Sequence, residues 1–171
     1  AATVAWAVIT WRLQNQRRRA RMDVSLRLWR WSLASFAVAA LLVALLEFVW
    51  LPPATAVSLG VLVLFGGFVS VMSAMLYKIV PFLIWLHLQK LGAAPLTMYE
   101  IITEPAMRRH AIAHAVALLL GLLLPWWSAL QVPTGLAMLI AFALLSFNLA
   151  QAVWRYWRAR KMTVEIGSNE K

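Results

Sequence analysis

Three histidines are the residues of this sequence best suited to chemistry. His110 and His114 are one helical turn apart, so a helix places both imidazoles on one face. That spacing can hold one metal ion, or set one imidazole on a haem iron with the other nearby. In the plainer interpretation, His110 lies in the headgroup zone and His114 hydrogen-bonds to a neighbouring helix. His87 joins the pair only if the segment after Pro81 folds back toward the His110 helix.

Four other polar residues stand within apolar runs. Tyr77 and Lys78 precede Pro81, and an ionisable residue beside a helix-breaking proline is a candidate functional site. The alternative is a lysine whose ammonium group snorkels to the membrane interface. Glu47 is interpreted as an interfacial carboxylate that reaches water, with a proton relay as the alternative. Asn148 can hydrogen-bond across helices in the inner half of the last span.

The sequence contains no complete catalytic set. It lacks a phosphate-cradling glycine loop, an HExxH motif and a nucleophile–histidine–acid combination. Cysteine is absent, which excludes disulfides and thiolate metal sites. We therefore expect that the chain is not an enzyme on its own.

The composition is that of a membrane protein. Of its 171 residues, 63% are hydrophobic and 13% are charged, whereas a soluble domain has about half apolar and a quarter charged residues. The apolar residues form long uncharged blocks, which is typical of membrane spans. A net charge of +10 would suggest nucleic-acid binding in a soluble protein. Here the basic residues flank the apolar blocks, so the expected partner is the lipid bilayer and not nucleic acid.

The apolar blocks predict one all-α membrane domain over residues 1–171. We expect a polytopic transmembrane helix bundle with about four full spans, because about 20 apolar residues cross ~30 Å of hydrocarbon. A partial N-terminal span and one broken or interfacial helix near Pro81 complete it. The chain opens inside an apolar stretch, which suggests that a portion preceding residue 1 is missing. The expected spans are 1–11 (partial), 30–51, 55–77, 110–130 and 135–154, with basic loops at 12–29 and 90–109 and a tail at 155–171.

The segment over residues 54–90 is too long for one simple span. As a single helix it would measure roughly 55 Å. We expect a break at Pro81, which removes one helical hydrogen bond, with Gly66-Gly67 as a second candidate. The alternative moves the span to 68–88 and brings Lys78 near mid-membrane. Gly66, Gly67, Ser70, Ser73 and Ala74 form a small-residue face suited to close helix packing.

The basic residues predict the orientation. All 16 lie on one side of the expected topology, and the turns at 51–54 and 131–134 hold none. The positive-inside rule places the basic side and the C-terminus in the cytoplasm. The expected location is the inner membrane of a bacterium. Tryptophans near both ends of the spans fit the aromatic belts of a bilayer.

The string MLYKIVPFLIWLHLQ, residues 75–89, together with DVSLRL at 23–28, resembles the C-terminal region of longer polytopic membrane proteins of proteobacteria. Those proteins are distantly similar to the nitric-oxide-response haem–copper membrane proteins (the NnrS family) and to subunit I of haem–copper oxidases. The resemblance extends from Arg17 to Arg160. It implies that haem is a possible cofactor, with His87, His110 and His114 as the available ligands. None of the three matches a particular oxidase ligand, which argues against a complete haem–copper centre within this chain.

Three functional hypotheses follow. The first is a non-catalytic subunit or segment that packs with other membrane subunits in a larger energy-converting complex, respiratory or photosynthetic. It is motivated by short loops, many aromatic residues and the absence of a catalytic set. The second is a haem- or metal-binding oxidase-like protein. The third is a small-molecule or ion carrier with a broken-helix site at Lys78, Pro81 and Gly66-Gly67.

Overall fold

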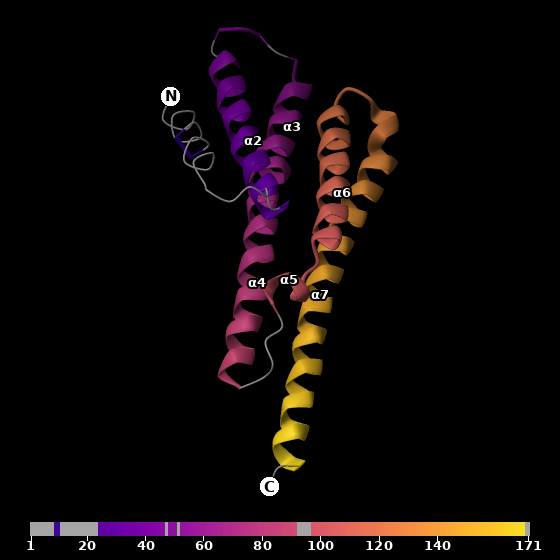
Figure 1. Ribbon diagram of the computed structural model, residues 1–171. Helices are drawn as coiled ribbons and strands as arrows, with labels where there is room; N and C mark the ends of the chain where they lie inside the picture. Colours follow the sequence, from indigo (N-terminus) through magenta and orange to yellow (C-terminus); the bar gives the residue numbers. More distant parts are fainter. Residues whose placement is uncertain (1–8, 11–23, 47, 51, 92–96, 170–171) are drawn as a thin grey trace.

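A computed structural model of the chain describes residues 9–10, 24–46, 48–50, 52–91 and 97–169. Every regular element in these residues is helical (Figure 1). Four helical stretches are long and apolar enough to cross a membrane. The chain is therefore a multi-pass, all-α membrane protein, as its composition predicts. The expected partial span at 1–11 lies almost wholly outside the described residues.

The four stretches form two hairpins that stand side by side (Figure 1). In one hairpin α2 packs against the long stretch formed by α3, η1 and α4. In the other hairpin α6 packs along α7. Contacts between α4 and α7 join the two hairpins. The bounds are α2 Val24–Leu46, α3 Ala54–Val61, η1 Leu62–Val69, α4 Ser70–Lys90, α6 Glu104–Leu123 and α7 Gln131–Asn169.

Two helices extend beyond the expected limits. The expected span at 110–130 is a helix that begins at Glu104, with Thr103 at its N-cap and proline in its first turn. This start agrees with the local sequence, because proline is tolerated where the helix has no donor to lose. The expected span at 135–154 belongs to α7, and the tail expected at 155–171 is helical as far as Asn169. Thus the basic residues after Trp154 prolong a helix and do not end it.

The predicted break at Pro81 is wrong. The proline is buried inside α4, which continues to Lys90. A membrane helix can accept a proline because neighbouring helices and local adjustments compensate for the lost hydrogen bond. The regular geometry changes instead at η1, a π-helical turn that contains Gly66 and Gly67. The second candidate of the sequence analysis is therefore the position where the long stretch departs from α-helical geometry.

The two glycines let η1 approach α2 closely. A Cβ atom on Gly66 would lie 2.6 Å from Ser35 Oγ, and one on Gly67 would lie 2.6 Å from ring atoms of Phe36. Real Cβ atoms essentially never come so close. The predicted small-residue face is confirmed, since all five of its members are buried. Close backbone contact between α2 and η1 is the structural reason for it.

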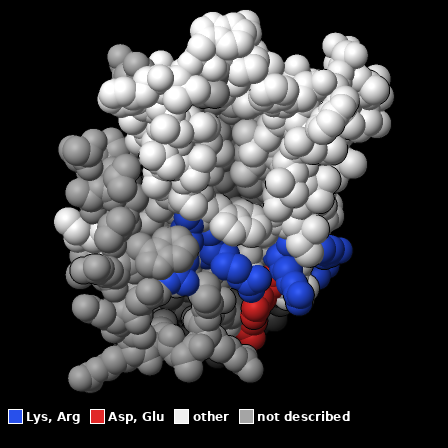
Figure 2. All heavy atoms as spheres, turned by 90° about the horizontal axis from the view of Figure 1, so that it is seen from above, with Lys and Arg blue, Asp and Glu red and all other residues white. Residues whose placement is uncertain are grey.

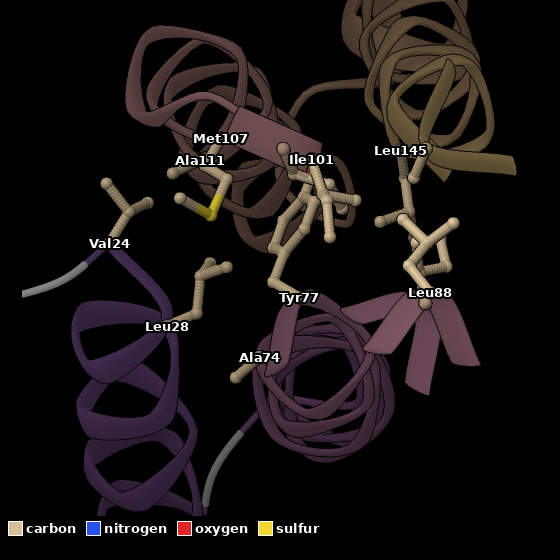
Figure 3. Close-up of a cluster of buried hydrophobic side chains, with 12 residues drawn as sticks. Val24, Leu28, Ala74, Tyr77, Leu88, Ile101, Met107, Ala111 and Leu145 are labelled. Atoms are coloured by element: carbon tan, nitrogen blue, oxygen red, sulfur yellow. The ribbon is translucent and has the colours of Figure 1, made fainter. Parts of the chain in front are cut away.

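The main apolar core lies in the half of the bundle near the N-terminus of α6. Figure 3 shows side chains from every neighbouring element meeting there, including Tyr77 from α4 and Met107 from α6. A short helix, α5 (Met98–Ile101), contributes Ile101, which is 1% exposed. The Arg155 guanidinium on α7 donates hydrogen bonds to the carbonyl groups of Glu100 and Ile101. This core fixes the elements that carry the polar residues described next.

Candidate functional site

A row of polar side chains lies along one face of α4. Ser70, Ser73 and Tyr77 are buried, with exposed fractions of 0%, 1% and 4%. Their spacing of three and four residues puts them on the same side of the helix. That side meets the two histidines of α6, which are each 1% exposed. The polar row therefore faces protein, as intramembrane polar residues do.

His114 is held on two sides. Its Nε2 atom lies 2.8 Å from Ser70 Oγ in a buried hydrogen bond. Its ring is stacked on Phe65, with the centroids 4.4 Å apart. Phe65 comes from the π-helical turn, so the irregular winding of η1 supplies one wall of the site. The plainer interpretation of the sequence, in which His114 bonds to a neighbouring helix, matches this geometry.

His110 has ring contacts but an unsatisfied nitrogen. It lies against Tyr77, with a centroid distance of 5.5 Å, and 5.8 Å from the ring of His114. Its Nδ1 atom has no hydrogen-bond partner among the described residues. Protein covers the His110 side chain, which is 1% exposed, and its expected place in the headgroup zone stays a prediction.

Asn148 links all three elements around His110. Its Nδ2 group donates to the hydroxyl oxygen of Tyr77 at 2.9 Å and to the carbonyl of Ala106 at 3.2 Å. The cross-helix hydrogen bonding expected of Asn148 is thus present. The Ala106 carbonyl lies one turn before His110 along α6, so the hydrogen bonds of Asn148 are nearer the N-terminus of α6 than His114 is.

The structure separates the remaining candidates from this group. His87 is exposed and packs edge-on against Tyr156, with ring centroids 6.1 Å apart. Because α4 continues through Pro81, His87 lies roughly 15 Å beyond Tyr77 along the helix axis. Lys78 is exposed on the same helix. Glu47 lies outside the described residues.

The space around the histidine pair is filled by side chains. A haem on either imidazole would have to displace the Phe65 ring or the Tyr77 ring, so the buried pair does not fit a porphyrin. A single metal ion would find two imidazoles, but no group of three His, Cys, Asp or Glu side chains suited to a metal occurs in the described ranges. What the arrangement offers directly is hydrogen bonding among imidazole, hydroxyl and amide groups inside a membrane span.

Sequence reasoning missed two partners in this group. Ser70 and Ser73 were expected only to favour close packing, yet Ser70 is the hydrogen-bond partner of His114. Phe65 carried no signal at all, because its contact with His114 depends on the local winding of η1. Polar residues at helical spacing on two apolar helices could have indicated the contact: Ser70, Ser73 and Tyr77 on one, and His110 and His114 on the other.

Comparisons with protein-family models, with curated proteins and with solved structures find nothing that matches this chain. The resemblance to haem–copper membrane proteins therefore stays a prediction from the sequence. The functional argument rests on the arrangement of the residues described above.

Proposed function

We propose that the chain is a non-catalytic subunit or segment of a larger energy-converting complex in a bacterial inner membrane. The observation that carries this proposal is a projecting arm, formed by α4 from Ile79 onward, which is mostly apolar, and by α7 from Trp154 onward, where basic and aromatic residues are mixed. In Figure 1 these two helices extend well past the ends of α2 and α6. On α4 the arm exposes Ile79, Phe82 and Leu83, each at 45% or more.

The length of the arm supports a protein partner. The stretch Ala54–Lys90 has 37 residues and is roughly 55 Å long, against about 40–45 Å for a bilayer with its headgroup regions. Lipid tails therefore cover only part of this apolar surface in an upright bundle. Apolar patches that lie beyond the lipid mark protein contacts. The partner that matches this apolar surface is an apolar helix of another membrane subunit.

The arm also carries a small hollow suited to an apolar side chain. It has a volume of about 210 Å³ and is lined by Leu83, Ile84, His87 and Tyr156. Partner side chains that fill such hollows often provide much of the energy of an interface. The exposed position of His87 at this hollow supports a role in subunit contact.

Charge supports the proposed orientation, with the arm and the C-terminus in the cytoplasm. Figure 2 looks onto the end that carries the α2–α3 and α6–α7 turns, and most of the described atoms seen from this end belong to uncharged residues, with Lys and Arg confined to a band across the lower middle of the view. No basic residue occurs from Trp31 to Tyr77 or from His110 to Trp154. Basic side chains begin on α4 and α7 where the arm begins, as the positive-inside rule requires of a cytoplasmic side.

The energy-converting class is supported by the buried histidines. Ionisable residues inside membrane spans are rare and commonly belong to proton or ion pathways. His110 and His114 are both 1% exposed, and helix packing alone does not require two buried imidazoles. The carrier alternative is weaker, because α4 continues through Pro81 and only the Gly66-Gly67 part of its expected broken-helix site departs from α-helical geometry.

Photo-crosslinking in native membranes tests the proposal. A photoreactive amino acid at Leu83, on the arm, should form a covalent adduct with another membrane protein, and the adduct's mass should identify it. The matched control is Leu139, which is 65% exposed on the outer part of α7 and should give lipid adducts. Lipid adducts at both positions, together with a native mass equal to this chain alone, would exclude the proposal.

A metal-binding function is the second candidate, favoured by the 5.8 Å separation of the His110 and His114 rings. Metal analysis of protein purified from its own membranes tests it. If the pair binds metal, His110→Gln and His114→Gln each lose the metal, whereas His87→Gln retains it. Equal metal content in all four proteins would reject this function.

A further inference from the structure

Two buried side chains next to the Ser70–His114 and Tyr77–His110 contacts each carry an unsatisfied polar atom. Ser73 Oγ and His110 Nδ1 are both buried, and neither has a hydrogen-bond partner among the described residues. Both side chains are 1% exposed. An unpaired polar group in an apolar environment costs several kcal/mol, so two such groups together indicate a polar guest between them.

The flanking contacts place Ser73 opposite the histidines. On α4, Ser73 lies between Ser70, which bonds to His114, and Tyr77, which contacts His110. Ser73 is on the side of the helix away from Ala74, and Ala74 faces the α2 residue Leu28 in Figure 3. Along α4, Ser73 therefore lies between the residue that bonds to His114 and the residue that contacts His110.

We propose that Ser73 Oγ and His110 Nδ1 together bind one internal water molecule, which extends the hydrogen bonding of the polar row to Ser73 and His110. In this proposal the water connects the hydrogen-bonded pair Ser70–His114 to His110, whose ring contacts Tyr77 of the second pair, Tyr77–Asn148. The row covers about 10 Å along α4. Its inner end adjoins the exposed Lys78. A chain of imidazole, hydroxyl and water groups in a membrane span is the usual chemistry of a proton relay.

Water fits this position better than a larger ligand. Buried waters bind where two to four polar partners converge. The Ser73 hydroxyl can donate or accept, and the His110 nitrogen can do either according to tautomer. Phe65 and Tyr77 fill the neighbouring space. This inference does not depend on a partner subunit, so the crosslinking result leaves it intact.

Solid-state NMR of ¹⁵N-histidine protein in lipid nanodiscs tests the water directly. In the wild-type protein the His110 Nδ1 signal should show a cross peak to a bound water proton. Ser73→Ala should remove that cross peak and shift the His110 signal. The His114 signals should change little, because Ser70 still bonds to Nε2. Ser146→Ala, at an exposed serine of α7, is the matched control and should leave all signals unchanged.

Hydrogen–deuterium exchange of the His114 ring proton tests the chain. His114 is 1% exposed, so its ring proton should exchange with solvent through the water and His110. Ser73→Ala should slow this exchange severalfold, whereas Ser146→Ala should not. A wild-type His110 without a water cross peak would overturn the proposal, and so would unchanged exchange in a Ser73→Ala protein with native spectra.

Discussion

Asn148 shows how a single polar residue can hold three helices together within a membrane. Its amide group binds the Tyr77 hydroxyl of α4 and the Ala106 carbonyl of α6 at the same time. Bulk water does not reach these contacts, because Asn148 is 4% exposed. The side chain therefore fixes the relative height of three elements, which apolar packing alone determines only loosely.

Asn148→Ala should destabilise the bundle by about 1 kcal/mol, because it leaves the Tyr77 hydroxyl without its donor. Reversible unfolding in detergent measures the change. Ser146→Ala, on the exposed side of the same helix, should have almost no effect. If the two residues act through their hydrogen bond, Tyr77→Phe combined with Asn148→Ala should cost less than the sum of the single changes. Strict additivity would contradict the assignment.

The capping box of α5 provides a pH-dependent contact outside the spans. The Glu100 carboxylate accepts a hydrogen bond from the Thr97 backbone N–H at 2.7 Å. This bond, with a second from the Thr97 side chain, holds the pKa of Glu100 below its ordinary value of 4.5. Because the folded pKa is lowered, the stabilisation is complete above the ordinary value and is lost as the pH falls through the folded pKa.

Amide exchange at Thr97 should therefore become faster as the pH is lowered below 4.5, after correction for the intrinsic exchange rate. Glu100→Gln keeps an acceptor but cannot titrate, so its protection should not vary with pH in this range. A pH-dependent loss of equal size in Glu100→Gln would show that another group is responsible.

Among the helices, η1 is the element whose geometry the site needs most. Its π-helical winding places Phe65 against His114 and lets Gly66 and Gly67 touch α2. Such turns are uncommon and often occur at functional sites. Without Cβ atoms at these two positions, α2 can lie close enough to cover the outer end of the polar row.

Gly67→Ala should destabilise the fold by about 1–3 kcal/mol, since the new methyl group would overlap the Phe36 ring. The ring cannot move freely, because it packs edge-on against Phe68 at 5.2 Å. Gly60→Ala is the matched control in α3, where a Cβ meets nothing within 4 Å. It should be neutral or stabilising by about 0.5–1 kcal/mol. Thermal unfolding of both variants would compare them, and an equal loss would disprove close packing at Gly67.

The sequence predicted those elements that depend on local chemistry. Apolar blocks identified four spans, although α6 begins at Glu104, before the expected span at 110–130. Continuity through Pro81 could not be predicted, because it depends on neighbouring helices that compensate for the missing hydrogen bond. Because α4 continues through Pro81, His87 lies far from His110 and His114 on α6 and is not part of the site. The contacts of His110 and His114 with α4 depend on the height at which two helices pack, and one sequence does not specify it.

The whole molecule has two unlike ends. At one end the turns are short and hold no Lys or Arg, and Trp50, Trp126 and Trp127 are exposed there. At the other end α4 and α7 project with basic and apolar side chains mixed. There Arg158 lies 4.2 Å from the ring centre of Trp154, an arrangement suited to the level of lipid headgroups. This asymmetry makes the orientation testable.

Cysteine accessibility should reveal one orientation. The chain has no cysteine, so single substitutions give labelling without background. In intact cells a membrane-impermeant thiol reagent should label Pro53→Cys and Gln131→Cys, both at exposed positions of the uncharged end. Lys90→Cys and Lys161→Cys, exposed at the basic end, should be labelled only after the cells are permeabilised, because the positive-inside rule keeps that end in the cytoplasm. Labelling of the basic-end cysteines in intact cells would reverse the topology, and the arm would then have to meet its partner outside the cytoplasm.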